Sequence, residues 1–246
     1  MKNYKIILQY DGSRYKGWQV QKNTDMTIQG KIEAILKRMA GHPVEVHGSG
    51  RTDAGVHALA QVANFKLEEH FGESEIFLYL NEYLPEDIRV LSIEEVPLRF
   101  HSRLNAVSKT YRYRIWNGAK ADVFERKCVE VIPEKLELEK MREAAAFLIG
   151  THDFMAFCGN RKMKKSTVRT IMGIDITKKG DEVQISITGN GFLQNMVRII
   201  TGTLIEVGLG KREADSVKET LEQKDRTQAG YTVSPKGLAL VEVNYD

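Results

Sequence analysis

Cysteine is scarce in this chain of 246 residues. Its two cysteines, Cys128 and Cys158, share no CxxC or Cys–His spacing, so neither a disulfide framework nor a zinc site is expected. The six histidines are scattered and form no pair with metal-ligand spacing. We therefore expect two buried free thiols and no metal centre.

Long apolar runs are absent as well. A stretch such as 197–209 is interrupted by two glycines and by Arg198 and Glu206, so no segment is expected to span a bilayer. The first residues lead directly into a strand pattern, without an apolar signal-peptide core or a small-residue cleavage site. We expect a cytoplasmic protein with no membrane partner.

A phosphate-binding P-loop is also missing. Residues 48–58 (GSGRTDAGVHA) contain three glycines, which marks backbone that turns sharply or approaches another group closely. Where a Walker A motif ends in GK[ST], this loop has Arg51, Thr52 and Asp53, and a carboxylate repels phosphate. The pattern alone favours a structural turn. The alternative is a reactive centre at Asp53, beside Arg51.

Neither sign of charge dominates, since the formal net charge is +3. An apolar fraction of 42% and a charged fraction of 28% are ordinary for a folded globular chain with a real core. Basic residues nevertheless gather in two stretches. Their members are Arg99, Arg103, Lys109, Arg112 and Arg114, and then Arg161, Lys162, Lys164, Lys165 and Arg169. Such clusters fit either a cationic face for a polyanion or ordinary solvated surface.

Hydrophobic periodicity predicts a β-α-β-β-α-β order in the first part of the chain. Thr27 is the expected N-cap of the first helix, with Gly41 beyond its end; Ser74 is the expected cap of the second helix, which Pro85 stops. The expected elements are strands at 4–10, 44–47, 61–67 and 88–96, and helices at 28–39 and 74–84.

The second part repeats this order with one added helix. Its expected elements are strands at 110–116, 167–177, 182–188 and 238–245, and helices at 136–149, 192–207 and 213–223. Two split βαβ units in series predict an α+β fold of two tandem βαββαβ (ferredoxin-like) halves, residues 1–105 and 106–246. The halves are expected to form one mainly antiparallel sheet, with helices on one side and an open cleft on the other.

The loop, the duplication and the basic clusters together resemble the tRNA pseudouridine synthase A family. Residues 50–58 look like the catalytic signature of that family. Agreement continues at 109–113 (KTYRY), 152–154 (HDF) with Phe157, 165–170 (KSTVRT), 191–198 (GFLQNMVR) and 235–238 (PKGL). These six motifs follow the family order across nearly the whole chain, so the resemblance is specific.

The resemblance implies an isomerase that converts uridine to pseudouridine at positions 38, 39 and 40, in the anticodon stem-loop of tRNA. The N-glycosidic bond breaks, the uracil turns, and it rejoins the ribose through C5. This reaction needs no redox change and no energy source, so no cofactor is expected. The resemblance also implies a homodimer in which one tRNA touches both subunits.

By the same resemblance, Asp53 is the catalytic carboxylate, attacking C1′ or C6 or removing a sugar proton. Arg198 is implied as its counter-ion, because the neighbouring residues leave that helix little polar face. Tyr111 is implied as the platform on which the target base stacks, with core packing as the alternative. Once the base has flipped out, Arg51 enters the vacated stack or binds the adjacent phosphate, and a plain salt bridge is its alternative. Leu238 closes the apolar side of the base pocket.

Phosphate contacts are expected from basic residues in the second half. They are Lys109, Arg112, Arg161, Lys162, Lys164 and Lys165. Two other functions stay open: a tRNA-binding or folding protein without catalysis, and an aspartate-dependent nucleosidase or glycoside hydrolase. The hydrolase normally needs a second placed carboxylate, which the loop lacks.

Overall fold

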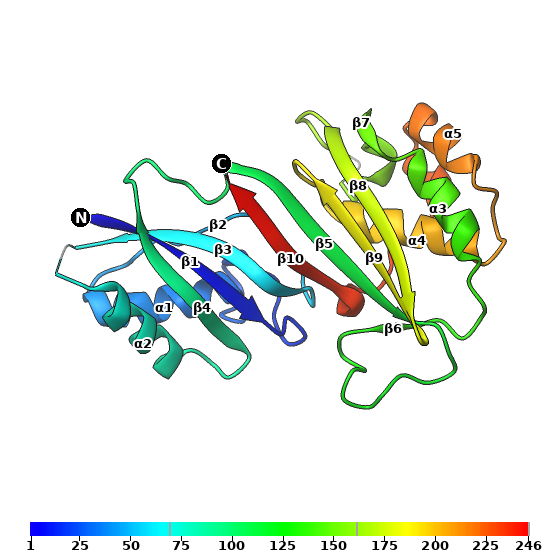
Figure 1. Ribbon diagram of the computed structural model, residues 1–246. Coiled ribbons are helices and arrows are strands. Elements are labelled where there is room, and N and C mark those ends of the chain that lie inside the picture. Colours follow the sequence, from blue (N-terminus) through cyan, green and yellow to red (C-terminus); the bar gives the residue numbers. More distant parts are fainter. Residues whose placement is uncertain (69, 161, 246) are drawn as a thin grey trace. The chain divides into compact units, whose positions relative to one another are not determined.

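The chain forms two compact units in a computed structural model that describes residues 1–68, 70–160 and 162–245 (Figure 1). The first unit comprises Met1–Val107 and Ala239–Asp246, and the second comprises Ser108–Leu238. The chain therefore leaves the first unit once and returns to it for its last strand. The predicted domains, 1–105 and 106–246, stay a prediction.

In the first unit, the strands have the order β4-β1-β3-β10. Strand β1 is antiparallel to β3 and β4, whereas β10 runs parallel to β3, with Ala239 opposite His57. A short strand, β2, pairs with β3, and helix α2 packs on β4 and on α1. The elements are β1 (Lys2–Tyr10), α1 (Ile28–Ala40), β2 (His47–Gly48), β3 (His57–Leu67), α2 (Glu73–Tyr83), β4 (Ile88–Val96) and β10 (Leu238–Tyr245).

Helix α1 follows its predicted signals. The Thr27 side chain accepts a hydrogen bond from the Gly30 amide, and Gly41 ends the helix in the left-handed conformation (φ 80°). Helix α2 differs, because Gly72 and not Ser74 stands at its N-cap and makes no side-chain cap bond. The expected cap at Ser74 is therefore wrong. The helix instead begins with Glu73, whose negative charge suits a helix N-terminus.

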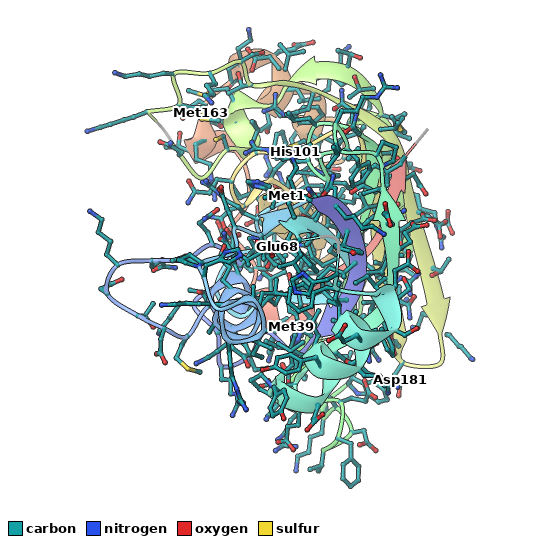
Figure 2. The ribbon with its side chains drawn as sticks, turned by 90° about the vertical axis from the view of Figure 1, so that its left-hand side faces the viewer. Met1, Met39, Glu68, His101, Met163 and Asp181 are labelled. Atoms are coloured by element: carbon teal, nitrogen blue, oxygen red, sulfur yellow. The ribbon has the colours of Figure 1, made fainter. Side chains whose placement is uncertain are left out.

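In the second unit, the strands have the order β5-β9-β8-β7, with neighbouring strands antiparallel. The predicted hairpin is confirmed: β8 and β9 join at Gly180 (φ 59°) and Asp181, which is labelled at the hairpin tip in Figure 2. The elements are β5 (Ala106–Trp116), β6 (Glu130–Val131), α3 (Leu138–Ala146), β7 (Gly150–Asp153), β8 (Val168–Lys179), β9 (Glu182–Gly189), α4 (Met196–Gly208) and α5 (Ser216–Gln223).

Several predicted boundaries move inward, and two strands were not predicted. Helix α4 begins at Met196 and not at residue 192, because Asn195 adopts a left-handed conformation (φ 59°) that a helix cannot pass through. Strands β6 and β7 span two and four residues, too few to show a period. The predicted α+β class with a mainly antiparallel sheet is confirmed.

Both cysteines are free, as expected. Cys158 is buried, but Cys128 is only half-buried, so the expectation of two buried thiols is wrong for Cys128. Within the described ranges, the structure contains no group of three or more potential metal-ligating side chains. None of the helices described is long and apolar enough to cross a membrane.

Candidate active site

Asp53 begins a tight turn in the segment between β2 and β3. The Val56 amide donates to the Asp53 carbonyl oxygen at 3.1 Å. Gly55 has φ 79°, in the left-handed region that strains residues with a Cβ. The prediction of a structural turn is therefore correct for this backbone. The same turn presents the side chain of Asp53, which is half-buried.

A second segment of the first unit clasps this turn. The Trp18 amide donates to the Thr52 carbonyl oxygen at 3.0 Å, and the Gly55 amide donates to the Tyr15 carbonyl oxygen at 3.2 Å. Gly17 permits this approach: its φ is 99°, and a Cβ there would lie 2.7 Å from the Thr52 oxygen. The loop is thus held by backbone bonds on both sides of Asp53.

Buried polar side chains also hold the loop by hydrogen bonds. The hydroxyl groups of Tyr10 and Thr52 lie 2.8 Å apart, and Gln61 Nε2 donates to the Gly50 carbonyl oxygen at 3.0 Å. Ser49 Oγ donates to Gln61 Oε1 at 2.6 Å, and Gln61 Nε2 also reaches the Tyr10 hydroxyl at 3.4 Å. Burial raises the pKa of Tyr10 to about 12, so its hydroxyl stays protonated near neutral pH. The network was not predicted from the sequence.

Arg51 lies exposed on the same loop. Its Nε donates to Gln19 Oε1 at 2.9 Å, so this partner is a neutral amide. The contact orders the guanidinium without cancelling its charge. Gln19 was not predicted either, although it is part of the segment that clasps the loop.

Tyr111 and Tyr113 lie on the same face of β5, in the second unit. Tyr111 is 7% exposed, and its ring packs edge-on against Phe192 with centroids 5.1 Å apart. Tyr113 is fully buried, and its hydroxyl donates to the Ser234 carbonyl oxygen at 2.9 Å. Burial raises the pKa of Tyr113 well above its ordinary value. Of the two rings, that of Tyr113 is the more deeply buried in the core.

Arg198 lies in the first turn of α4 and is half-buried. Its Nε donates to the Val233 carbonyl oxygen at 2.8 Å, and its Nη1 donates to Asn195 Oδ1 at 3.0 Å. These two hydrogen bonds within the second unit therefore help to position the guanidinium. Its role as counter-ion of Asp53 stays a prediction.

Leu238 is buried at the start of β10, directly after the 3₁₀ turn Pro235–Gly237. A Cβ at Gly237 would lie 2.8 Å from the ring of Tyr113, so this turn is packed closely against β5. The position of Leu238 follows from that packing. Its contact with a base stays a prediction.

The basic residues predicted to contact phosphate divide between β5 and a loop. Alternation along β5 places Lys109 on the face of Tyr111 and Arg112 on the opposite face. Arg112 Nε reaches Ser186 Oγ at 3.4 Å. Lys162, Lys164 and Lys165 are exposed in the loop around Met163, which Figure 2 labels. Arg161 lies outside the described residues.

Asp153 holds the two ends of that loop together. Its Oδ1 accepts hydrogen bonds from Thr167 Oγ1 at 2.5 Å and from the Met155 amide at 3.2 Å. Its Oδ2 lies 3.0 Å from Lys224 Nζ. The hydrogen bond from Thr167 is the main reason that the pKa of Asp153 is below its ordinary value. The exposed lysines thus extend from a loop whose base is tied.

A family described as tRNA pseudouridine synthase matches residues 6–105 and 144–246. The chain belongs to the tRNA pseudouridine synthase family. It is 48% identical over 245 residues to "tRNA pseudouridine synthase A 2" of Bacillus cereus, and 51% identical to "tRNA pseudouridine synthase A" of Bacillus sp. (strain KSM-64), with 100% of each chain covered. It is also 46% identical to "tRNA pseudouridine synthase A 2" of Clostridium tetani, covering 100% of this chain and 99% of that one. The resemblance inferred from the motifs is confirmed.

The predicted site residues of this chain lie in both of its units. Asp53 and Arg51 share one loop of the first unit. The second unit carries Tyr111, Arg198, Leu238, Lys109, Arg112, Lys164 and Lys165.

Proposed function

We propose that this protein isomerises uridine to pseudouridine in tRNA, with Asp53 as the catalytic carboxylate. The observation that carries the proposal is the loop of Asp53, held by backbone bonds on both sides and by buried hydroxyl and amide groups beneath. Rigid placement of a reacting group lowers the entropic part of a barrier. Membership of the family supports the reaction type and favours catalysis over a purely RNA-binding function.

The isomerisation needs one carboxylate and no external electrons. Either Asp53 attacks C1′ or C6 and forms a covalent adduct, or it removes a sugar proton. In each case the N1–C1′ bond breaks and a C5–C1′ bond forms, while C5 loses a proton and N1 gains one, either directly or by exchange with solvent. A carboxylate must be ionised for any of these steps, and we assign Arg198 as the cation that favours the ionised form.

Tyr111 is the proposed platform for the target base. Its contact with Phe192 fixes the plane of the ring, and stacking on an aromatic face holds a base without requiring a sugar bond. Leu238 supplies the apolar wall beside the base. Flipping the target base out of the stem costs a few kcal/mol of unstacking, and Arg51 then enters the vacated stack or binds the adjacent phosphate.

The proposed substrate is the anticodon stem-loop of tRNA, at positions 38, 39 and 40. Lys164 and Lys165 are exposed and suit phosphate contacts, and Lys109 lies on the face of Tyr111. Arg112 lies on the other face of β5, so a phosphate contact there involves a different part of the RNA. We further propose a homodimer and a cytoplasmic location.

The decisive experiment replaces the carboxylate by an amide of the same shape. Asp53→Asn is expected to fold, to bind tRNA with unchanged affinity and to lose pseudouridine formation by about a thousandfold or more in single-turnover assays. Asp181→Asn, at the tip of the β8–β9 hairpin, is the matched control and is expected to retain full activity. Wild-type activity in Asp53→Asn would refute the assignment.

A second pair of variants separates catalysis from RNA binding. Lys164→Glu with Lys165→Glu is expected to weaken tRNA binding and to reduce its salt dependence, because phosphate contacts release counterions. A non-catalytic RNA-binding protein would respond to this charge reversal and ignore Asp53→Asn. The enzyme responds to both.

A further inference from the structure

A chain of side-chain hydrogen bonds runs from Arg51 to helix α1 within the first unit. Arg51 Nε donates to Gln19 Oε1 at 2.9 Å, and Gln19 Nε2 donates to Gln29 Oε1 at 2.7 Å. Gln29 Nε2 in turn donates to Glu33 Oε1 at 2.8 Å. Four consecutive side chains thus connect an exposed arginine to the first turns of a helix.

The direction of this chain is fixed at Gln29, which is only 7% exposed. Its Oε1 also accepts from the Val20 amide at 3.0 Å, and its Nε2 also donates to the Val46 carbonyl oxygen at 3.1 Å. Both donors and both acceptor positions of the amide are therefore used. A flipped amide would place its NH₂ against the Val20 N–H and its oxygen against the Val46 carbonyl oxygen.

This constraint passes to Gln19. Because Gln29 presents an acceptor, Gln19 must turn its NH₂ group toward Gln29, and its oxygen then faces Arg51. Glu33 fixes the other end, since its Oε1 also accepts from the Val46 amide at 3.1 Å. Val46 directly precedes β2, which leads into the loop. The same group of hydrogen bonds therefore fixes both the start of the loop and the orientation of Arg51.

The hydrogen bond at Nε orients the plane of the Arg51 guanidinium. The edge formed by its two Nη groups then points away from Gln19. That edge matches two oxygens of a phosphate. An arginine ordered before binding also loses less side-chain freedom on binding. We propose that Gln19 is a positioning residue that aims Arg51 at the RNA, with Gln29 and Glu33 as its anchor. The proposal rests on the RNA-handling role proposed above for Arg51.

The first test is Gln19→Ala, assayed by single-turnover pseudouridine formation over a range of tRNA concentrations. Loss of one hydrogen bond to a charged group predicts a fall of about tenfold in kcat/KM. The variant is expected to stay folded, with its unfolding temperature lowered by only a few degrees because Gln29 loses one partner. Gln21→Ala is the matched control: Gln21 is exposed on the same segment, donates to the Lys16 carbonyl oxygen at 2.8 Å, and its loss is expected to leave activity unchanged. An equal fall in both variants would overturn the proposal.

The second test combines Gln19→Ala with Arg51→Ala. If Gln19 acts through Arg51, the double variant is no slower than Arg51→Ala alone. An undiminished effect of Gln19→Ala in the Arg51→Ala background would overturn the proposal. So would a normal rate in Arg51→Ala, which would also remove the proposed role of Arg51.

A measurement that does not depend on activity shows separately whether the hydrogen bond from Gln19 orders Arg51 and whether RNA handling depends on that bond. In nitrogen-15 NMR of the free protein, the Arg51 Nε–H signal is expected to exchange faster with solvent in Gln19→Ala, and to be unaffected in Gln21→Ala. An unchanged Arg51 signal would show that the hydrogen bond does not order the guanidinium. A faster exchange together with normal activity would show that the bond exists but that RNA handling does not depend on it.

Discussion

The hydroxyl pair of Tyr10 and Thr52 offers a direct test of whether a rigid loop supports catalysis. Tyr10→Phe removes a buried hydroxyl that lies 2.8 Å from Thr52 Oγ1 and 3.4 Å from Gln61 Nε2. The shorter contact dominates, and a buried polar group left unsatisfied costs about 1–3 kcal/mol. We expect Tyr10→Phe to lower the free energy of unfolding by about 2 kcal/mol, or Tm by about 4–8 °C.

Thr52→Val is expected to cost a similar amount, because it leaves the Tyr10 hydroxyl without that partner. The double variant replaces both polar groups by apolar groups of the same shape. Its cost is expected to be about 1 kcal/mol less than the sum of the single costs. Thermal and urea unfolding of the four proteins measures this coupling, and strictly additive costs would refute the proposed pairing.

The catalytic effect follows because Thr52 directly precedes Asp53. A misplacement of about 1 Å can cost about a hundredfold in rate, so single-turnover rates are expected to fall about 10- to 100-fold while tRNA affinity is retained. Tyr4→Phe is the matched control: the Tyr4 hydroxyl donates to the Phe71 carbonyl oxygen at 2.6 Å, on the same strand but away from the loop. Equal rate losses in Tyr4→Phe and Tyr10→Phe would refute the reasoning.

Two further variants test other parts of the structure. In the folded protein the pKa of Asp153 is depressed, mainly by the hydrogen bond from Thr167. The Asp153 carboxylate therefore stabilises the fold at pH values above its unfolded pKa of about 3.9, and this contribution is lost as pH falls through its folded pKa. Asp153→Asn removes the contribution. Urea midpoints between pH 2 and 6 should therefore vary less steeply in this variant than in the wild type. Gly17→Ala adds a Cβ 2.7 Å from the Thr52 oxygen at a φ of 99°, and is expected to lose well over 1 kcal/mol and most activity. Gly41→Ala, with a φ of 80° and no atom within 4 Å of its Cβ, should lose only the strain component, and equal losses at both glycines would contradict the close approach.

The regular elements could be predicted where one local pattern decides them. Helix α1 has its apolar period, its Thr27 cap and its Gly41 stop, and β4 and β10 were predicted with their observed bounds. Predicted element boundaries were wrong where a single residue takes an unusual backbone conformation. Nothing in the apolar run around α4 shows that Asn195 adopts a left-handed conformation, because a positive φ there depends on the surrounding tertiary contacts.

Long-range pairing was equally invisible in the local pattern. The alternation at 238–245 predicts a strand but not its neighbour, and β10 in fact pairs in parallel with β3 of the first unit. Likewise, three glycines predict that residues 48–58 turn, but the partner that clasps them, around Gly17, is more than 30 residues away. Turn chemistry is local, whereas what a turn packs against is decided by the whole fold.

The supporting residues that could not be predicted from the sequence share one property, burial of a polar side chain. Gln29 lies beside the apolar residues of α1 and Gln61 lies within the buried strand β3, and both are buried. A search for apolar periodicity treats such positions as interruptions of the core pattern. Yet a buried amide is costly unless all its hydrogen bonds are made, so it persists where it holds backbone or side chains that apolar packing cannot orient. Here Gln61 holds the backbone of the Asp53 loop, and Gln29 anchors Gln19, which aims Arg51. Each interruption of the core pattern therefore marks a residue that supports the site.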